Sequence, residues 1–261
     1  MTGAYAFHRF DRAARTYEAT ADVQNAVAAD LLRLTGGIAL PLHARILEIG
    51  AGTGVYSRLL RNRFPNATII ATDSSPGMLN QVRENVSGSR NVVTVFDPDG
   101  RLPVTGAFHL VTSSSALHWI PDFDRLCRRI AELLGPQGWF TFAIMVRGTL
   151  WEIREAVRRT APRKTHPRNL PDPHGVLRTV AANGLRLIHH ELKVRQVVYP
   201  NARQMLRRIH EQGVTGGIYG TRPPGLNRSE LARLQRYCDE TFAGSDGVHL
   251  SYRILYAIFR R

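Results

Sequence analysis

Three glycines stand at alternate positions, Gly50, Gly52 and Gly54, directly after an apolar run in the stretch "RILEIGAGTGVYSRLL". Glycine lacks a Cβ atom, so a turn of this kind lets the backbone approach a bound ligand closely. A strand, a glycine turn and a helix in succession place that ligand at the N-terminus of the helix. Dinucleotide-binding turns have the pattern G-x-G-x-x-G, but Val55 stands at the position of its last glycine. The stretch therefore predicts a ligand-binding turn whose spacing differs from the dinucleotide pattern.

Acidic residues stand where they can hold the same ligand. Glu48 precedes the turn, and Asp73 and Asp97 end the next two apolar runs. A carboxylate at the end of such a strand accepts hydrogen bonds from ribose hydroxyls in nucleotide-binding folds. The combined pattern E-x-G-x-G-x-G resembles that of class I S-adenosylmethionine-dependent methyltransferases. Their cofactor has no phosphates, so its ribose and amino-acid tail need only lie against bare backbone.

The resemblance to class I methyltransferases implies a set of cofactor contacts. Asp73 is expected at the ribose hydroxyls and Asp97 beside the adenine amino group, while Ser113 and Ser114 are expected at the methionine end. The expected cofactor-binding residues are Glu48, Gly50, Ala51, Gly52, Gly54, Asp73, Ser74, Met78, Asp97, Pro98, Ser113 and Ser114. No metal site is expected, because the two cysteines stand in no metal-ligand pattern.

The elements that must position these residues alternate along the chain. Strands are predicted from short apolar runs at 44–50, 67–73, 91–97, 107–115, 138–146, 185–199 and 249–261. Helical patterns follow the first, second and fourth of these runs, and this alternation indicates a doubly wound parallel sheet. We therefore predict an α/β fold of the class I methyltransferase (Rossmann-like) type, with a seven-stranded, mostly parallel sheet, N-terminal helices and a helical cap.

Three regions are expected along the chain. Residues 1–40 are predicted as N-terminal helices that close the cofactor site, and residues 41–146 as the cofactor-binding core. Residues 147–261 are predicted to complete the sheet. Between its last two strands, helical patterns predict a cap at about 200–245.

Motifs along nearly the whole chain resemble one family, the malonyl-[acyl-carrier protein] O-methyltransferases of biotin synthesis. Those shared with many small-molecule methyltransferases are "LEIGAGTG", "TDSSPGML" and "SSSALHWI". The more specific ones are "FDRAARTYEATADVQ" near the N-terminus, "GTLWEI", "RRIHEQGVTG", "LNRSELARLQ" and the closing "LSYRILYAIF". The resemblance implies methyl transfer from S-adenosylmethionine to the free carboxylate of malonyl-acyl carrier protein or malonyl-coenzyme A. The product is the methyl ester that primes pimeloyl and biotin synthesis.

Such a reaction needs alignment more than acid–base chemistry. A carboxylate is already ionised at neutral pH, so no general base is required and none is predicted. An arginine fork would suit the substrate carboxylate, with Arg147 and Arg207 as candidates. Tyr17 could close the site from the N-terminal helix, and His118 and Trp119 could wall the transfer chamber.

Charge is unevenly distributed along the chain, whose formal net charge is +14. Residues 1–146 carry 14 Arg against 12 Asp and Glu, whereas residues 147–261 carry 21 Lys and Arg against 9 Asp and Glu. This asymmetry predicts a large acidic partner. The family resemblance implies that the partner is an acidic acyl carrier protein carrying a malonyl thioester. The expected docking face comprises arginines near 154–168, 203–208 and 222–236.

Other classes of function are less consistent with the sequence. No run approaches the roughly 18 apolar residues of a membrane span, and the N-terminal stretch lacks a signal-type apolar core. A cytoplasmic protein without a membrane partner is expected. An RNA- or DNA-modifying methyltransferase would typically carry an NPPY-type motif or an RNA-binding module, so no nucleic-acid partner is expected. Another carboxyl methyltransferase, of the trans-aconitate type, and a non-catalytic binding protein remain open alternatives.

Overall fold

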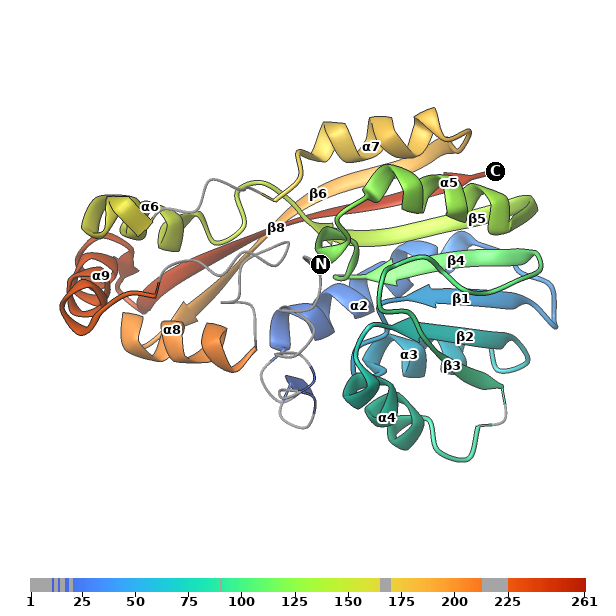
Figure 1. Cartoon of the computed structure of the whole chain (residues 1–261), viewed down its shortest axis with the longest axis horizontal. Helices are drawn as coiled ribbons and strands as arrows, with labels where there is room; N and C mark the ends of the chain where they lie inside the picture. The colour runs from blue at the N-terminus through green and yellow to red at the C-terminus, as the bar shows by residue number, and fades with distance from the viewer. Residues whose placement is uncertain are drawn as a thin grey trace.

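The computed structural model describes residues 11, 14, 17, 18, 21–89, 91–164, 170–212 and 225–261. Within these residues an eight-stranded sheet has the order β3-β2-β1-β4-β5-β8-β6, with β7 paired to β8 (Figure 1). The strands are β1 Arg45–Ile49, β2 Thr68–Asp73, β3 Val92–Phe96, β4 Phe108–Ser114, β5 Leu134–Met145, β6 Arg186–Tyr199, β7 Ala243–Gly244 and β8 Gly247–Arg260. Neighbouring strands from β1 to β5 pair in parallel, and β8 runs antiparallel between β5 and β6. The predicted class I methyltransferase fold is confirmed.

The sheet differs from the prediction in one strand. All seven predicted strands form, but the two-residue strand β7 was not predicted. It makes a tight hairpin with the start of β8, where Ala243 pairs with Val248. Two residues are too few to show the alternating pattern by which strands are recognised in a sequence.

Helices cover both faces of the sheet. They are α2 Asp22–Leu34, α3 Val55–Arg63, α4 Pro76–Asn85, α5 Phe123–Leu133, α6 Trp151–Thr160, α7 Pro173–Ala182, α8 Ala202–Glu211 and α9 Arg228–Thr241. One hydrophobic core joins the sheet to α2 and α3, and a second joins its other face to α5 and α7. Strand β8 contributes to both, because Tyr256 and Ile254 face the first core while Leu255 and Ala257 face the second. Burial on both faces explains its nearly continuous apolar sequence.

Local signals fix the ends of several helices. The Ser75 side chain caps α4 by accepting from the backbone of Met78, and Pro76 follows at the first helical position. Asn227 and Glu230 form a reciprocal capping box at the start of α9. The cap of α4 positions residues next to the end of β2, where the candidate site lies.

The three helices α6, α8 and α9 lie together around the far ends of β6 and β8 (Figure 1). β5 pairs with β8 only over residues 254–260, so the first half of β8 extends beyond the parallel sheet with β6 as its partner. We call this group of helices the cap. No helix in the described ranges is long and apolar enough to cross a bilayer. Both cysteines are buried free thiols, Cys127 on α5 and Cys238 on α9.

Candidate active site

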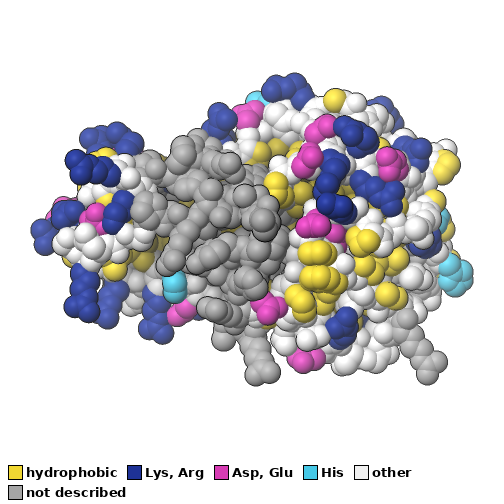
Figure 2. All heavy atoms as spheres, in the orientation of Figure 1, with side chains coloured by type: hydrophobic (Ala, Val, Ile, Leu, Met, Phe, Trp, Pro, Cys, Tyr) yellow, Lys and Arg dark blue, Asp and Glu magenta, His cyan; other side chains and the backbone are white. Residues whose placement is uncertain are grey.

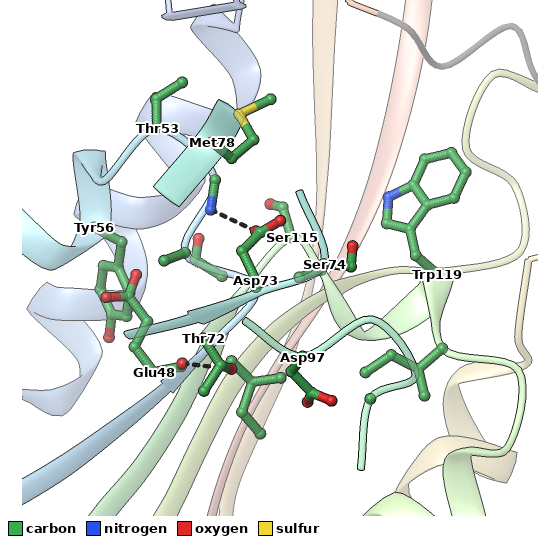
Figure 3. Close-up of a pocket in the computed structure, with 18 of the residues that line it drawn as sticks. Glu48, Thr53, Tyr56, Thr72, Asp73, Ser74, Met78, Asp97, Ser115 and Trp119 are labelled. Atoms are coloured by element: carbon green, nitrogen blue, oxygen red, sulfur yellow. Dashed lines mark hydrogen bonds between the residues drawn. The ribbon is translucent and has the colours of Figure 1, made fainter. Parts of the chain in front are cut away.

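A cavity of about 870 Å³ lies at the carboxyl ends of the parallel strands. Its walls come from the turn between β1 and α3, the end of β2, the loop after β3 and the segment after β4, with one side of α2 above them. Figure 3 shows how these segments converge. Ligands of open α/β sheets bind at this edge, where the chain leaves the strands for helices on opposite faces.

The glycine turn supplies the floor of the cavity. Gly50 and Gly52 both have positive φ, +69° and +56°. A Cβ atom on Gly50 would lie 2.2 Å from Cβ of Ala116, whereas one on Gly52 would meet nothing within 4 Å and would point into open space. The amides of Gly50 and Ala51 both donate to the carbonyl of Thr72, so the turn is fixed to β2. The turn thus presents bare backbone to the cavity, as the sequence predicted.

Gly54 has a different position from its neighbours in the motif. It is the N-cap of α3 with φ +88°, and a Cβ atom there would lie 3.0 Å from Cα of Val82 on α4. It is not among the described residues that line the cavity. The absence of a side chain at Gly54 therefore allows close packing between α3 and α4, and its predicted contact with the cofactor stays a prediction.

Asp73 and Asp97 brace the loops that line the cavity. One oxygen of Asp73 accepts from the amide of Gly52 at 2.9 Å (Figure 3). The other oxygen accepts from the amide of Ser75 at 2.9 Å. Burial raises the pKa of Asp73, although these backbone donors counteract the rise. Asp97 accepts from the amides of Arg101 and Leu102, which closes the loop after β3. Both carboxylates keep lone pairs for a ligand, because each oxygen accepts only one of these bonds.

Glu48 is a buried carboxyl group at the end of β1, with 1% of the residue exposed. Ser57 on α3 donates to its Oε2 atom at 2.5 Å. Burial raises the pKa of Glu48 to about 8, and the nearby charge of Asp73 adds to the rise. Glu48 and Asp73 therefore create a site that favours a cationic ligand, since a positive charge there would offset the cost of ionising them.

The raised pKa of Glu48 gives a testable dependence of stability on pH. The folded protein holds this proton up to about pH 8, whereas an unfolded chain loses it near pH 4.3. The unfolded state therefore gains stability relative to the folded one as pH rises between these values. We expect the free energy of unfolding of the cofactor-free protein to fall by a few kcal/mol over this window on account of Glu48. Glu48→Gln should remove most of that fall in urea titrations at pH 5, 6.5 and 8.

The surface residue Glu132 provides the matched control, because its side chain is 55% exposed. Glu132→Gln should show the same pH dependence of the free energy of unfolding as the wild type. If the free energy of unfolding changed with pH in the same way in the wild type and in Glu48→Gln, the raised pKa of Glu48 would be contradicted.

Two polar atoms in the cavity wall have no hydrogen-bond partner among the described residues. A bound cofactor could provide one for each. Gln24 on α2 and Ser115 after β4 line the cavity. The Oε1 atom of Gln24 and the Oγ atom of Ser115 are both buried without a hydrogen-bond partner among the described residues. Ser115 also has a positive φ of +59°, a strained conformation for a residue other than glycine. S-adenosylmethionine carries an ammonium group, a sulfonium and ribose hydroxyls, so it supplies donors and positive charge. The glycine cradle, the three carboxylates and these orphaned atoms fit that cofactor.

The N-terminal segment reaches the cavity through a few described residues. Asp11 accepts from the Ser75 hydroxyl and the Gly77 amide, and Glu18 forms an ion pair with Arg58 on α3 at 2.9 Å. Tyr17 lines the cavity, and burial raises its pKa to about 12, so its hydroxyl stays protonated. That residues 1–40 close the cofactor site stays a prediction supported by these contacts.

Most of the predicted site residues meet in the cavity. Those that line it are Tyr17, Glu48, Gly50, Ala51, Gly52, Asp73, Ser74, Met78, Asp97, Pro98, Ser114 and Trp119. Ser113 does not, because its side chain is fully buried and its hydroxyl donates to the carbonyl of Ile49 at 2.8 Å. This hydrogen bond joins β4 to β1, so the structure does not place Ser113 with the residues that line the cavity.

Three predicted substrate residues also lie outside the described lining. Arg147 is 60% exposed and faces Asp172 at 3.9 Å, and Arg207 is 79% exposed and paired with Glu211 at 2.8 Å. His118 is buried against a separate cavity of about 220 Å³ beside α7, where burial lowers its pKa to about 3 and keeps it neutral. The sequence placed these residues near strand ends or on a cap helix, but it could not show which way they point.

The comparisons with known proteins agree with this geometry. A family model described as a methyltransferase domain matches residues 18–190. The malonyl-[acyl-carrier protein] O-methyltransferase of Geobacter sulfurreducens is 30% identical over 97% of this chain and 96% of its own length, and that of Chlorobium phaeovibrioides is 29% identical over 97% and 94%. A solved structure of a putative methyltransferase from Bacillus halodurans shares the fold, with a TM-score of 0.63 at 15% identity over 90% of this chain and 98% of that one. The chain belongs to the malonyl-[acyl-carrier protein] O-methyltransferase family of class I S-adenosylmethionine-dependent methyltransferases.

Proposed function

We propose that this protein transfers a methyl group from S-adenosylmethionine to the free carboxylate of a malonyl thioester carried by acyl carrier protein. The proposal rests on similarity that extends through the cap as well as the cofactor half, over 97% of the chain. The product would be the methyl ester that primes pimeloyl and biotin synthesis.

The residues of the cavity suit a reaction that depends on alignment. When bound, the cofactor supplies an electrophilic methyl group on a positively charged sulfur. The glycine turn and Asp73 would hold it, while Tyr17 and Trp119 line the same cavity. Tyr17 keeps its proton and can donate to an incoming carboxylate. The acceptor is already an anion, so these residues need only orient it and exclude water.

An assay with several acceptors tests the function. The purified protein is incubated with labelled methyl donor and, separately, malonyl carrier protein, malonyl-coenzyme A, trans-aconitate and RNA. We expect label on the malonyl thioesters alone. Label on trans-aconitate or RNA, with none on either thioester, would refute it.

The cap carries a face that suits an acidic carrier protein. Exposed arginines, here called the cap arginines, are Arg154, Arg158, Arg159, Arg203, Arg207, Arg228, Arg233 and Arg236. They come from α6, α8 and α9, and dark-blue side chains gather on that end of the molecule in Figure 2. Long-range attraction to such a surface speeds the encounter with a partner of opposite charge. Parts of the predicted docking face, residues 165–168 and 222–224, lie outside the described residues.

Neutralising part of this face should raise the KM for malonyl carrier protein more than the KM for malonyl-coenzyme A. Arg154, Arg203 and Arg236 form no ion pair within the described chain, so their replacement by alanine removes charge without breaking an ion pair. We expect the KM for malonyl carrier protein to rise about 10-fold and that for malonyl-coenzyme A to change less than about 2-fold.

A triple variant on α3 and α4, with Arg61, Arg63 and Arg83 changed to alanine, removes the same charge elsewhere. It should affect both acceptors little. Equal increases in the two KM values for the cap variant would reject docking at this face.

A further inference from the structure

A second cavity, here called the α7 cavity, lies beside α7 and next to the cofactor cavity. Its volume is about 220 Å³. Ile120 lines both cavities, whereas the residue before it, Trp119, lines the cofactor cavity. Most of the described lining of the α7 cavity is apolar and comprises Leu117, Ile120, Phe123, Ile144, Pro171 and Val176. An apolar cavity of about 150 Å³ is large enough for benzene, so the α7 cavity has room for a molecule of that size.

One side chain of this lining carries a polar atom without a partner. His118 lines the α7 cavity, and only 6% of the residue is exposed. Its Nδ1 atom is buried without a hydrogen-bond partner in the part of the chain that the structure describes. Burial lowers the pKa of His118 to about 3, so the ring is neutral and has one donor and one acceptor nitrogen. Burying such a ring without partners costs free energy, which a ligand that bonds to it would offset.

The other polar side chains of the described lining already have partners. Asp172 is the N-cap of α7 and accepts from the amide of Gly175 at 2.9 Å. The hydroxyl of Thr179 donates to the carbonyl of Gly175 at 3.0 Å. The first turn of α7 is therefore capped by the chain itself and needs no ligand for that purpose. The ring of His118 is the group in this lining that a ligand would satisfy.

The charges around the α7 cavity favour an uncharged ligand. The amide of Gly175 lowers the pKa of Asp172, so its carboxylate is ionised and disfavours an anion nearby. Arg147 lies 3.9 Å from the same carboxylate and already offsets its charge, so a cationic ligand would gain little. The apolar walls disfavour a charge of either sign. A small, mostly apolar molecule with a single hydroxyl or carbonyl group suits this cavity.

We propose that the α7 cavity is a second binding site, for a small uncharged molecule with an apolar body and one polar group that hydrogen-bonds to the His118 ring. The apolar walls supply most of the affinity, and His118 selects for the polar group. The site is separate from the cofactor cavity, so both can be occupied at once. On this assignment His118 serves the α7 cavity, while Trp119 serves the cofactor cavity.

Four compounds of similar size test the ligand class. Phenol has the apolar ring and one hydroxyl group, toluene lacks the polar group, and benzoate and benzylamine carry a charge. We expect phenol to bind with a dissociation constant of about 1 mM or lower. Each of the other three should bind about 5-fold more weakly or worse, because it lacks the hydrogen bond or brings a charge into apolar surroundings. Phenol should bind equally well with and without saturating adenosylhomocysteine.

Methyl resonances locate the bound phenol. Ile144 and Val176 line the α7 cavity and are not part of the described lining of the cofactor cavity. Their methyl signals in carbon–proton correlation spectra should shift as phenol is added, and the shifts give the dissociation constant.

Two variants change the site in different ways. His118→Leu removes the ring nitrogens, so phenol should bind about 5- to 10-fold more weakly while toluene binds within about 2-fold of the wild type. Val176→Phe puts a larger side chain into the cavity and should weaken both compounds at least about 10-fold. Leu177→Phe is the matched control, because Leu177 is on the same helix and packs against the same core but is not in the described lining. It should bind phenol as the wild type does.

Melting temperature and adenosylhomocysteine titration show that each variant is folded. Several results would overturn the site: no methyl shifts with phenol, benzoate bound as well as phenol, or displacement of phenol by adenosylhomocysteine. Unchanged phenol affinity in folded His118→Leu would contradict the role of the ring, and unchanged affinity in folded Val176→Phe would contradict the location.

Discussion

Gly50→Ala is expected to lower the affinity for S-adenosylmethionine by at least about 100-fold, a loss of about 3 kcal/mol or more. The added Cβ atom would lie 2.2 Å from Cβ of Ala116 on a residue whose φ is +69°. Left-handed backbone costs a non-glycine residue about 1–2 kcal/mol, and overpacking typically adds about 1–3 kcal/mol. Relief of the clash must shift Gly50 or Ala116, and both line the cavity. Isothermal titration with the cofactor measures the effect.

Gly184→Ala separates backbone strain from the clash. Gly184 has φ +84° and would meet nothing within 4 Å if it carried a Cβ atom, and it follows α7 outside the lining of the cavity. That variant should lose stability through strain but keep the affinity of the wild type. Wild-type affinity in Gly50→Ala would show that the glycine turn does not hold the cofactor.

Asp73→Ala should weaken cofactor binding by about 100-fold or more. The substitution removes the acceptor of two backbone amides, those of Gly52 and Ser75, both at 2.9 Å. A hydrogen bond to a charged group contributes about 1.5–3 kcal/mol. The glycine turn therefore loses one of its links to β2, that of Gly52, and the cavity loses a carboxylate that could hold the cofactor. Titration calorimetry at constant salt, with the melting temperature measured alongside, gives the affinity of folded protein.

Asp172→Ala is the matched variant for Asp73→Ala. Asp172 also accepts a backbone amide, that of Gly175 at 2.9 Å, but it caps α7 away from the cofactor cavity. It should lower the melting temperature and leave cofactor affinity unchanged. Equal losses of affinity in the two variants would mean that Asp73 acts only through general stability.

The fold was predictable because its signals are local. Apolar runs ending in glycine or aspartate marked β1 to β3, and the apolar sequence of β8 reflects burial on both faces. The cofactor half of the site followed from the same signals, since Gly50, Gly52 and Asp73 stand at the ends of those strands. The fold and the methyltransferase family are confirmed, whereas the roles of individual site residues and the three-region division stay predictions.

Side-chain direction was the part that the sequence could not give. Ser113 and Ser114 are adjacent on β4 and so point to opposite faces, and only Ser114 reaches the cavity. Gln24 reaches it from α2 because that helix packs across the sheet, although it ends the motif "FDRAARTYEATADVQ" that carried the family resemblance. Arg147 also follows a strand and was predicted to bind the substrate carboxylate, yet its side chain points to Asp172 and solvent.

The most direct measurement follows the methyl group onto its acceptor. Malonyl carrier protein is incubated with the enzyme and ¹³C-methyl-labelled S-adenosylmethionine, then analysed by intact mass spectrometry and carbon NMR, with acetyl carrier protein as the acceptor that lacks a free carboxylate. We expect one labelled methyl ester on the malonyl group, released as methanol by mild alkali, and no label on acetyl carrier protein. Unlabelled malonyl carrier protein, or equal labelling of the two carrier proteins, would contradict it.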